Sequence, residues 1–194
     1  MIVWVNGTFG VGKTTCVFEL SKRLSEAYVF DPELIGHAFK KGAPKEFPED
    51  YQDYPLWRET VYQHLKHLST FDSPILVPMT IYKPESYQDI ILRLKNDGVE
   101  LHHFILDASK ATVNSRLLKR FDFGKTWARK KLPEVMQVFQ HDIKGTKIRV
   151  DNLSPEQTAN VIIDKIKLEK KPDYRPAPVR AIQRYANSVK HIHR

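Results

Sequence analysis

Cysteine, long apolar runs and low-complexity segments are scarce in this sequence, and each shortage excludes a class of protein. The 194 residues include one cysteine, Cys16, which cannot form an internal disulfide. No apolar run approaches the roughly 20 residues of a bilayer-spanning helix, and the start of the sequence lacks the basic and apolar regions of a signal peptide. With 8 glycines and 12 prolines, the composition is unlike that of collagen or of a disordered chain. We therefore expect a folded, cytoplasmic protein.

Positive charge is abundant but concentrated in two segments. The sequence carries 31 Lys and Arg against 23 Asp and Glu, a formal net charge of +8. Residues 116–131 and residues 170–194 each hold seven basic residues and one acidic residue, so the rest of the chain is mildly acidic. This distribution argues against a uniformly basic surface, and no nucleic-acid-recognition motif is present. We expect no nucleic-acid partner.

Short apolar runs alternate with segments of helical periodicity. The runs that predict strands are residues 2–5, 28–30, 75–77, 101–106 and 147–150. This alternation predicts right-handed βαβ units and a five-stranded parallel sheet with helices on both faces, which is a three-layer α/β/α fold. We expect one domain over residues 1–169, followed by a proline-containing basic linker and a C-terminal helix within residues 170–194.

A phosphate-binding motif of the Walker A type directly follows the first predicted strand. Its residues are Gly7-Thr8-Phe9-Gly10-Val11-Gly12-Lys13-Thr14, which fit G-x-x-x-x-G-K-[ST] and precede a helical segment. Glycines let backbone N–H groups point at a polyphosphate, and the helix adds the positive end of its dipole. Lys13 is expected to contact the β- and γ-phosphates and Thr14 to hold Mg²⁺. The alternative is a glycine-rich turn with a chance lysine.

Three further residues can complete a phosphoryl-transfer site. Asp31 ends the second predicted strand, so it projects at the carboxyl edge of the sheet beside the phosphate loop. There it can organise Mg²⁺, accept a proton from an attacking hydroxyl, or cap the helix that begins at Pro32. Arg116 and Arg120 are four residues apart on one helix, where two guanidinium groups can grip the transferred phosphoryl group. A solvated basic face is the alternative for these arginines.

An aromatic segment between the second and third predicted strands is the candidate substrate-binding region. It contains Asp53, Tyr54, Trp57 and Arg58. Aromatic faces beside one cation and one carboxylate suit a flat ring or a sugar, although a place in the core is the alternative for Trp57. The eight histidines show no spacing typical of a zinc site, so we expect no transition metal.

Together these segments resemble the tunicamycin-resistance ATP-binding protein family, which is itself similar to the P-loop kinases of nucleoside monophosphates, shikimate and chloramphenicol. The segments that carry the resemblance are the phosphate loop, Asp31-Pro32, residues 50–58, Val77-Pro78-Met79-Thr80 and the Arg116/Arg120 pair. Nucleoside monophosphate kinases usually have a glycine-containing segment ending in Pro-Arg where this chain has Pro78-Met79-Thr80. Ordinary monophosphate kinase activity is therefore not expected.

The resemblance implies a nucleoside- or shikimate-kinase-like fold with ATP and Mg²⁺ as cofactors. By this resemblance, residues 32–74 form the second-substrate region, residues 116–131 form a lid, and the loop over residues 150–154 borders the adenine. The nucleotide-binding residues that it implies are Gly7, Gly10, Val11, Gly12, Lys13, Thr14, Thr15 and Asn152.

Two functions are consistent with the motifs and the resemblance. The first is tunicamycin resistance through ATP-dependent phosphorylation of this nucleoside-like antibiotic or of another small molecule. In that reading the metal is held by Thr14 and Asp31, and the catalytic residues are Lys13, Asp31, Arg116 and Arg120. The alternative is ATP-dependent binding and sequestration of the antibiotic without chemistry.

The end of the chain has the pattern of a basic amphipathic helix. Between residues 179 and 194, apolar residues fall on one face and basic residues on the opposite face. Such a helix can lie in an anionic membrane interface or pack on the protein's own surface. The resemblance implies membrane association through this tail, so peripheral contact of residues 177–194 with the inner face of the cell membrane is one expected arrangement.

Overall fold

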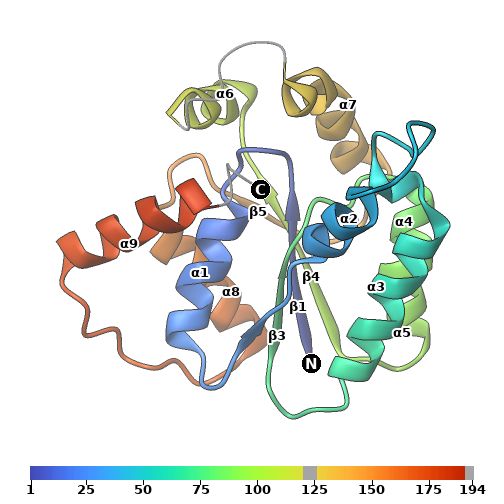
Figure 1. The fold of residues 1–194 in the computed structure, drawn as a ribbon. Helices are drawn as coiled ribbons and strands as arrows, with labels where there is room; N and C mark the ends of the chain where they lie inside the picture. Colours follow the sequence, from blue (N-terminus) through green and yellow to red (C-terminus); the bar gives the residue numbers. More distant parts are fainter. Residues whose placement is uncertain (120–125, 191–194) are drawn as a thin grey trace.

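A parallel sheet between two layers of helices organises the molecule (Figure 1). The computed structural model describes residues 1–119 and 126–190. In that part the sheet has the order β2-β3-β1-β4-β5, and every pairing is parallel. Its strands are β1 (Ile2–Gly7), β2 (Tyr28–Val29), β3 (Ile75–Pro78), β4 (Leu101–Asp107) and β5 (Thr146–Arg149). The predicted three-layer α/β/α fold with a five-stranded sheet is confirmed.

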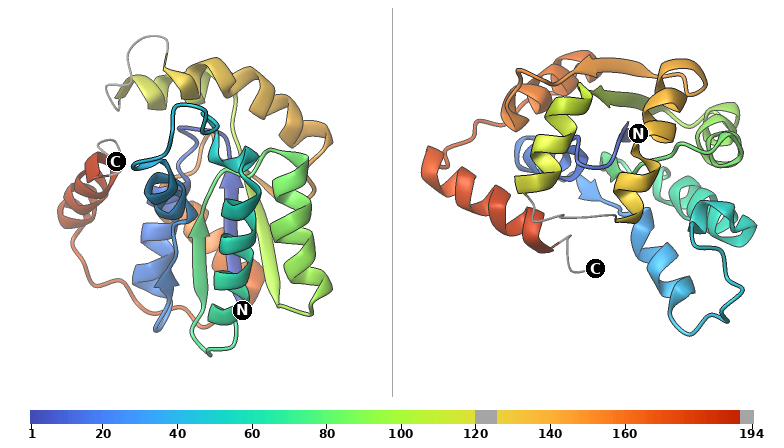
Figure 2. Two further views of the ribbon diagram at one scale, coloured as in Figure 1. Left: turned by 45° about the vertical axis from the view of Figure 1, so that its right-hand side comes forward. Right: turned by 90° about the horizontal axis from the view of Figure 1, so that it is seen from above.

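Helices cover both faces of the sheet and its carboxyl end. One face is covered by α1 (Lys13–Arg23) and α8 (Pro155–Ile166), with α9 (Ala177–Lys190) beside them. The other is covered by α2 (Pro32–Lys40), α3 (Pro55–Leu68) and a helical stretch made of α4 (Pro84–Ser86), η2 (Tyr87–Leu92) and α5 (Arg93–Asn96). Helices α6 (Lys110–Lys119) and α7 (Trp127–His141) lie across the carboxyl ends of the strands (Figure 2).

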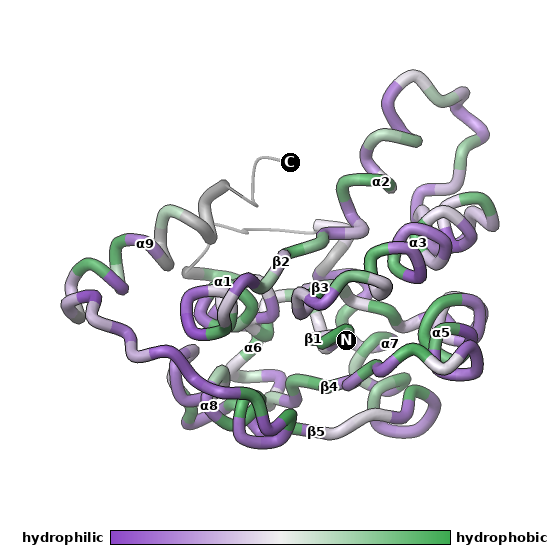
Figure 3. Tube along the Cα trace, turned by 90° about the horizontal axis from the view of Figure 1, so that it is seen from below, coloured by the Kyte–Doolittle hydropathy of each residue, from purple (hydrophilic) through white to green (hydrophobic). Residues whose placement is uncertain are grey.

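The central strand explains why the sheet is buried on both sides. Along β1, Ile2 and Trp4 pack into one apolar cluster, whereas Val3 and Val5 pack into the cluster on the opposite face. All four side chains have no exposed surface. Figure 3 shows the same arrangement, with hydrophobic residues along the central strands and hydrophilic residues on the outer turns of α5 and α8. An uninterrupted apolar strand is typical of a parallel sheet for this reason.

Two helices differ from their sequence predictions. The helix predicted at residues 134–140 begins earlier, at Trp127, because the Thr126 side chain caps it by accepting the N–H of Arg129. It continues through Pro133, which lies in its second turn. The helix predicted at residues 84–96 is present, but its middle, η2, is wound as a π-helix, which apolar spacing does not reveal. Of the predicted lid, residues 120–125, including Arg120, lie outside the described residues.

The C-terminal segment packs beside α1. Arg175 places Nη2 3.0 Å from Oε2 of Glu19, an α1 carboxylate with no exposed surface, and Arg180 pairs with Glu156 of α8 at 2.7 Å. Val179 and Ile182 are 39% and 68% exposed on α9. Residues 191–194, part of the predicted amphipathic helix, lie outside the described residues. Within the described ranges, no helix combines the length and apolarity required to cross a membrane.

Candidate functional site

The loop between β1 and α1 has a backbone shape that glycine makes accessible. Gly7, Gly10 and Gly12 have φ angles of 137°, 76° and 110°. A Cβ at Gly7 would lie 2.6 Å from the carbonyl oxygen of Leu106 on the neighbouring strand. Gly12 then caps α1, whose N-terminus therefore faces the loop. This strand, loop and helix arrangement is the one that exposes backbone N–H groups to an anion.

Buried side chains anchor the loop from below. The Asn6 carbonyl oxygen accepts the N–H groups of Gly7 at 2.8 Å and of Ile81 at 3.0 Å. Its amide nitrogen donates to the Ile81 carbonyl at 2.9 Å and faces Nε2 of His103 at 3.0 Å. Thr80 donates its hydroxyl to the Gly7 carbonyl at 3.0 Å. The residues after β3 therefore hold the start of the phosphate loop through Asn6 and Thr80.

His103 is the neutral end of this anchoring network. Its Nδ1 lies 2.8 Å from the Lys144 carbonyl, so Nδ1 carries the proton and Nε2 accepts from Asn6. Burial lowers the pKa of His103 to about 4, although the Lys144 carbonyl opposes that shift. A protonated Nε2 would face the amide hydrogens of Asn6, which makes the charged form unfavourable here.

The polar side chains of the loop fit a triphosphate. Lys13 is 8% exposed, and its ammonium donates to the carbonyls of Gly7 at 3.2 Å and Thr8 at 3.0 Å. The buried Thr8 hydroxyl has no hydrogen-bond partner within the described part of the chain. Thr14 and Thr15 are half-buried in the first turn of α1. A mobile ammonium, an orphaned hydroxyl and a helix start are the groups that phosphate oxygens and a phosphate-bound Mg²⁺ would engage.

Arg116 joins two loops in this conformation. Its Nη1 donates to the Val11 carbonyl at 2.5 Å, and its Nη2 donates to the Val150 carbonyl at 2.8 Å. Burial lowers its pKa, and the nearby Asp151 carboxylate opposes that effect. Arg116 thus contacts the phosphate loop but spends its donors on backbone carbonyls. The predicted grip on a phosphoryl group would require it to exchange these partners.

The segment predicted to border the adenine lines a hollow of its own. This hollow, about 370 Å³, is lined by Ser109, Arg149, Asp151, Asn152 and Leu153. Asp151 accepts hydrogen bonds from the Thr112 and Ser109 hydroxyls and from the Ser109 N–H. These bonds hold the pKa of Asp151 well below its usual range. Asp151 therefore ties the loop to the start of α6, which fixes Asn152 at the edge of the hollow.

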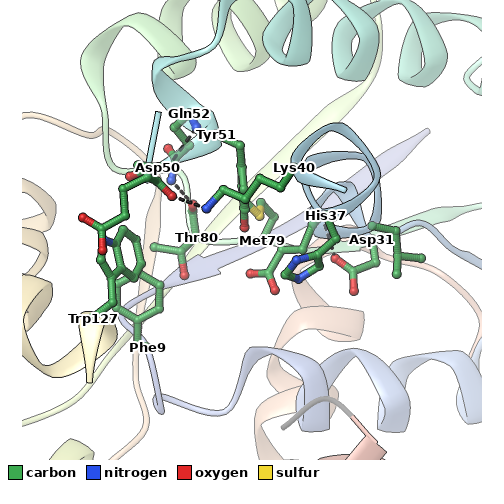
Figure 4. A pocket seen from close by; sticks show the side chains of 13 residues that line it. Phe9, Asp31, His37, Lys40, Asp50, Tyr51, Gln52, Met79, Thr80 and Trp127 are labelled. Atoms are coloured by element: carbon green, nitrogen blue, oxygen red, sulfur yellow. Dashed lines mark hydrogen bonds between the residues drawn. The ribbon is translucent and has the colours of Figure 1, made fainter. Parts of the chain in front are cut away.

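A second cavity lies against the phosphate loop, on the side of β2 and β3 (Figure 4). Its volume is about 370 Å³, and its lining residues are Phe9, Asp31, Glu33, Leu34, His37, Lys40, Glu49, Asp50, Tyr51, Gln52, Met79, Thr80 and Trp127. Phe9 belongs to the phosphate loop and Thr80 is bonded to it. The cavity and the loop therefore share residues.

Asp31 occupies the position that the sequence predicts. It follows β2, lines the cavity, and caps α2 by accepting the N–H of Glu33 at 3.0 Å. Burial and the Asp31 charge raise the pKa of Glu33 to about 7, while the Lys13 cation acts in the opposite direction. Two carboxylates and the loop lysine are thus close enough to influence one another.

The four residues predicted to contact the substrate support the cavity from behind. Trp57 has no exposed surface and donates its indole N–H to the Pro32 carbonyl at 3.1 Å, so it is a core residue and does not line the cavity. Tyr54 packs against Phe39 and Phe47 with ring centroids 5.8 and 4.7 Å apart.

Arg58 and Asp53 face a different hollow of about 460 Å³. Arg58 pairs with Asp89 at 2.7 Å, and Asp53 pairs with Lys83. Their charges are thus used in ion pairs outside the cavity. The aromatic residues that do line the cavity are Phe9, Tyr51 and Trp127. Phe9 and Trp127 were missed because a variable loop position and the start of a basic helix carry no signal of their meeting.

Solved structures of similar fold exist. The structure of the Deinococcus radiodurans tunicamycin resistance protein is 29% identical, covers 89% of this chain and 98% of that chain, and has a TM-score of 0.75. A shikimate kinase from Bacteroides thetaiotaomicron is 14% identical over 87% of this chain and 99% of that chain, with a TM-score of 0.58. The fold is that of the P-loop small-molecule kinases.

A third P-loop kinase was solved with bound nucleotide. The Mycobacterium tuberculosis APS kinase, in complex with AMPPNP and APS, is 18% identical over 86% of this chain and 97% of that chain, with a TM-score of 0.59. No protein-family model matches this chain, and no curated protein matches it. The resemblance to a tunicamycin resistance protein, drawn from the sequence, is therefore confirmed at the level of structure.

Proposed function

We propose that this protein transfers the γ-phosphoryl group of ATP to a hydroxyl group of a small molecule, with the nucleoside-like antibiotic tunicamycin as the candidate acceptor. The observation that carries the proposal is the shared boundary between the phosphate loop and a carboxylate-bearing cavity. Phe9 and Thr80 line the cavity while belonging or bonding to the loop. An acceptor in the cavity would therefore lie next to the terminal phosphate.

The residues divide the reaction between them. The loop glycines, Lys13, Thr14 and Thr15 hold the triphosphate, and a Mg²⁺ ion held by Thr14 and Asp31 would neutralise charge on its oxygens. The acceptor oxygen forms a bond to the γ-phosphorus as the bond to the bridging oxygen breaks, and ADP leaves. Asp31 accepts the hydroxyl proton. Lys13 stabilises the charge that develops on the phosphoryl oxygens.

The charge of the cavity favours an acceptor without a phosphate of its own. Its lining includes four carboxylates, Asp31, Glu33, Glu49 and Asp50, against His37 and Lys40. Among the described lining residues there is no arginine, the side chain best suited to bind a substrate phosphate. Hydroxyl groups, in contrast, can donate hydrogen bonds to carboxylates. This agrees with the Pro78-Met79-Thr80 segment, which lacks the Pro-Arg ending typical of monophosphate kinases.

Mass spectrometry tests this proposal. Purified protein is incubated with ATP, Mg²⁺ and tunicamycin, and the antibiotic is examined for the added mass of one phosphoryl group. We expect product with the native chain and none with Lys13→Ala. Absence of product at high protein concentration would reject tunicamycin as the acceptor, and a panel of nucleosides and sugars would then test phosphoryl transfer itself.

The second candidate is ATP-dependent capture of the antibiotic without chemistry. It is favoured by the capping bond of Asp31, because a residue that stabilises the start of α2 has a structural reason to be present. Turnover number separates the candidates. More than one phosphorylated molecule per protein supports the kinase, whereas protection that saturates at one antibiotic per protein supports capture.

We also propose peripheral membrane contact through residues 177–194. Exposed Val179 and Ile182 support this, whereas the ion pairs of Arg175 and Arg180 with the domain support packing on the protein's own surface. Co-sedimentation with anionic vesicles distinguishes the two. Loss of binding after removal of residues 177–194 supports the membrane role, and equal partitioning of both proteins contradicts it.

A further inference from the structure

Two aromatic side chains from distant parts of the chain meet at one side of the cavity. Phe9 is in the phosphate loop, and Trp127 is the first residue of α7. Their ring centroids are 5.3 Å apart and their planes are inclined by 68°, an edge-to-face contact. Figure 4 shows the pair on one side of the cavity and Asp31 and His37 on the opposite side. The cavity thus has an aromatic end and a polar end.

Both rings retain exposed surface, which distinguishes them from the aromatic residues of the core. Phe9 and Trp127 are half-buried, whereas Trp4 and Trp57 have no exposed surface and donate their indole N–H groups to backbone carbonyls at 3.1 Å. The packing of α7 onto the sheet rests on Leu132, Val135 and Phe139. The fold therefore does not depend on a large ring at Trp127.

We propose that Phe9 and Trp127 form the subsite for a planar heteroaromatic ring of the acceptor, while its hydroxyl groups face Asp31 and Glu33. This inference rests on the proposed phosphotransferase function and adds the acceptor class, a planar ring joined to a hydroxylated portion. Rings stack on aromatic side chains with little dependence on substituents. The pair therefore selects for a flat ring, whereas the carboxylates select for hydroxyl donors.

The adenine of ATP is not the ring assigned to this subsite. The hollow at Asn152 lies beside α6 and β5, and it shares no lining residue with the cavity. The cavity instead lies beside β2 and β3, whose ends supply Asp31, Met79 and Thr80. The two hollows therefore provide separate places for a nucleotide base and an acceptor ring.

Tryptophan fluorescence provides a direct test, because the sequence contains three tryptophans and the other two are fully buried. Titration with uridine, which has a planar ring and a sugar, is expected to quench the fluorescence saturably. Ribose, which lacks the ring, is expected to leave it unchanged. Trp127→Phe should remove the uridine-dependent change while retaining binding in calorimetry.

Affinity measurements complete the test. Trp127→Ala and Phe9→Leu should each weaken uridine binding roughly tenfold, the usual contribution of one stacking contact. Phe71→Ala is the matched control, since Phe71 is 55% exposed and lies outside the cavity. Thermal unfolding verifies that each variant folds, and Trp127→Phe keeps the test valid if Trp127→Ala does not. Uridine affinity that is unchanged in the folded variants would overturn the proposal, as would loss of ATP affinity alone.

The outcome is separable from the proposed function. Trp127-dependent uridine binding without phosphorylation of any acceptor would support the ring subsite and reject the kinase. Phosphorylation with an unchanged acceptor KM in folded Trp127→Ala would support the kinase and reject the subsite.

Discussion

The phosphate loop and the acceptor cavity share a boundary, yet they are built in different ways. The loop is one contiguous segment whose shape is fixed by glycine backbone angles and by buried bonds from Asn6 and Thr80. The cavity is assembled from side chains of five separate stretches of chain, among them the loop after β2, the turn before α3 and the start of α7. The loop is therefore rigid and general, whereas the cavity can change its specificity through single side chains.

The largest effect is expected at the rigid side. Lys13→Ala removes the cation that faces the triphosphate, so ATP-dependent turnover should fall by roughly 10²- to 10³-fold, the usual cost of losing one transition-state donor. The measurement is phosphoryl transfer at saturating ATP. Lys22→Ala, on the exposed side of α1, is the matched control and should retain activity. Turnover retained in Lys13→Ala would show that the loop does not act on the phosphates.

Removal of the loop anchor should affect stability most. Asn6→Ala leaves the buried N–H groups of Gly7 and Ile81 and the Ile81 carbonyl without their partner. The free energy of unfolding should fall by about 3 kcal/mol, because buried groups left unsatisfied cost about 1–3 kcal/mol each and relax in part. Denaturant unfolding measures this, with exposed Asn96→Ala as the control. Equal stability of Asn6→Ala and the native chain would contradict the anchoring role.

The same network predicts a pH dependence. The folded-state pKa of His103, about 4, lies below its ordinary value of 6.5, so the unfolded chain binds this proton first as the pH falls. The free energy of unfolding should therefore be highest above pH 6.5 and decrease between pH 6.5 and 4, by on the order of 2 kcal/mol from this residue. His103→Gln should flatten that decrease. His102→Gln, at the more exposed neighbouring histidine, should leave it in place.

The smallest effect is expected for a residue behind the cavity. Arg58→Ala removes an ion pair with Asp89 and a bond to the Gln52 carbonyl, but no cavity-lining group. The acceptor KM should change less than threefold and stability by about 1 kcal/mol, as for other partly exposed ion pairs. Kinetics with varied acceptor measure it. A tenfold increase in KM with unchanged stability would place Arg58 against the substrate and remove the contrast between the two regions.

Sequence patterns predicted the regions that depend on neighbouring residues. The spacing from Gly7 to Thr14 located the loop, apolar runs such as residues 75–77 located the strands, and Asp31-Pro32 indicated a helix cap that the structure contains. Each of these signals is local, because a backbone angle, a capping bond or a buried strand is determined by residues close in the chain.

Contacts between distant segments could not be predicted in the same way. Trp57 and Tyr51 are both aromatic residues of one segment, yet Trp57 is buried under Pro32 and Tyr51 lines the cavity. The difference arises from which face of α2 and α3 meets the sheet, and periodicity does not determine this. The contact of Phe9 with Trp127 likewise depends on α7 beginning seven residues before the predicted helix.

The most direct test of the account is a crystal structure with a non-hydrolysable ATP analogue and the acceptor bound together. The account predicts that the acceptor occupies the cavity with a hydroxyl oxygen roughly 3–3.5 Å from the γ-phosphorus, in line with the bridging oxygen and within hydrogen-bond distance of Asp31. An acceptor whose hydroxyl groups all lie beyond reach of the γ-phosphate, with both ligands bound, would contradict it and support capture without chemistry.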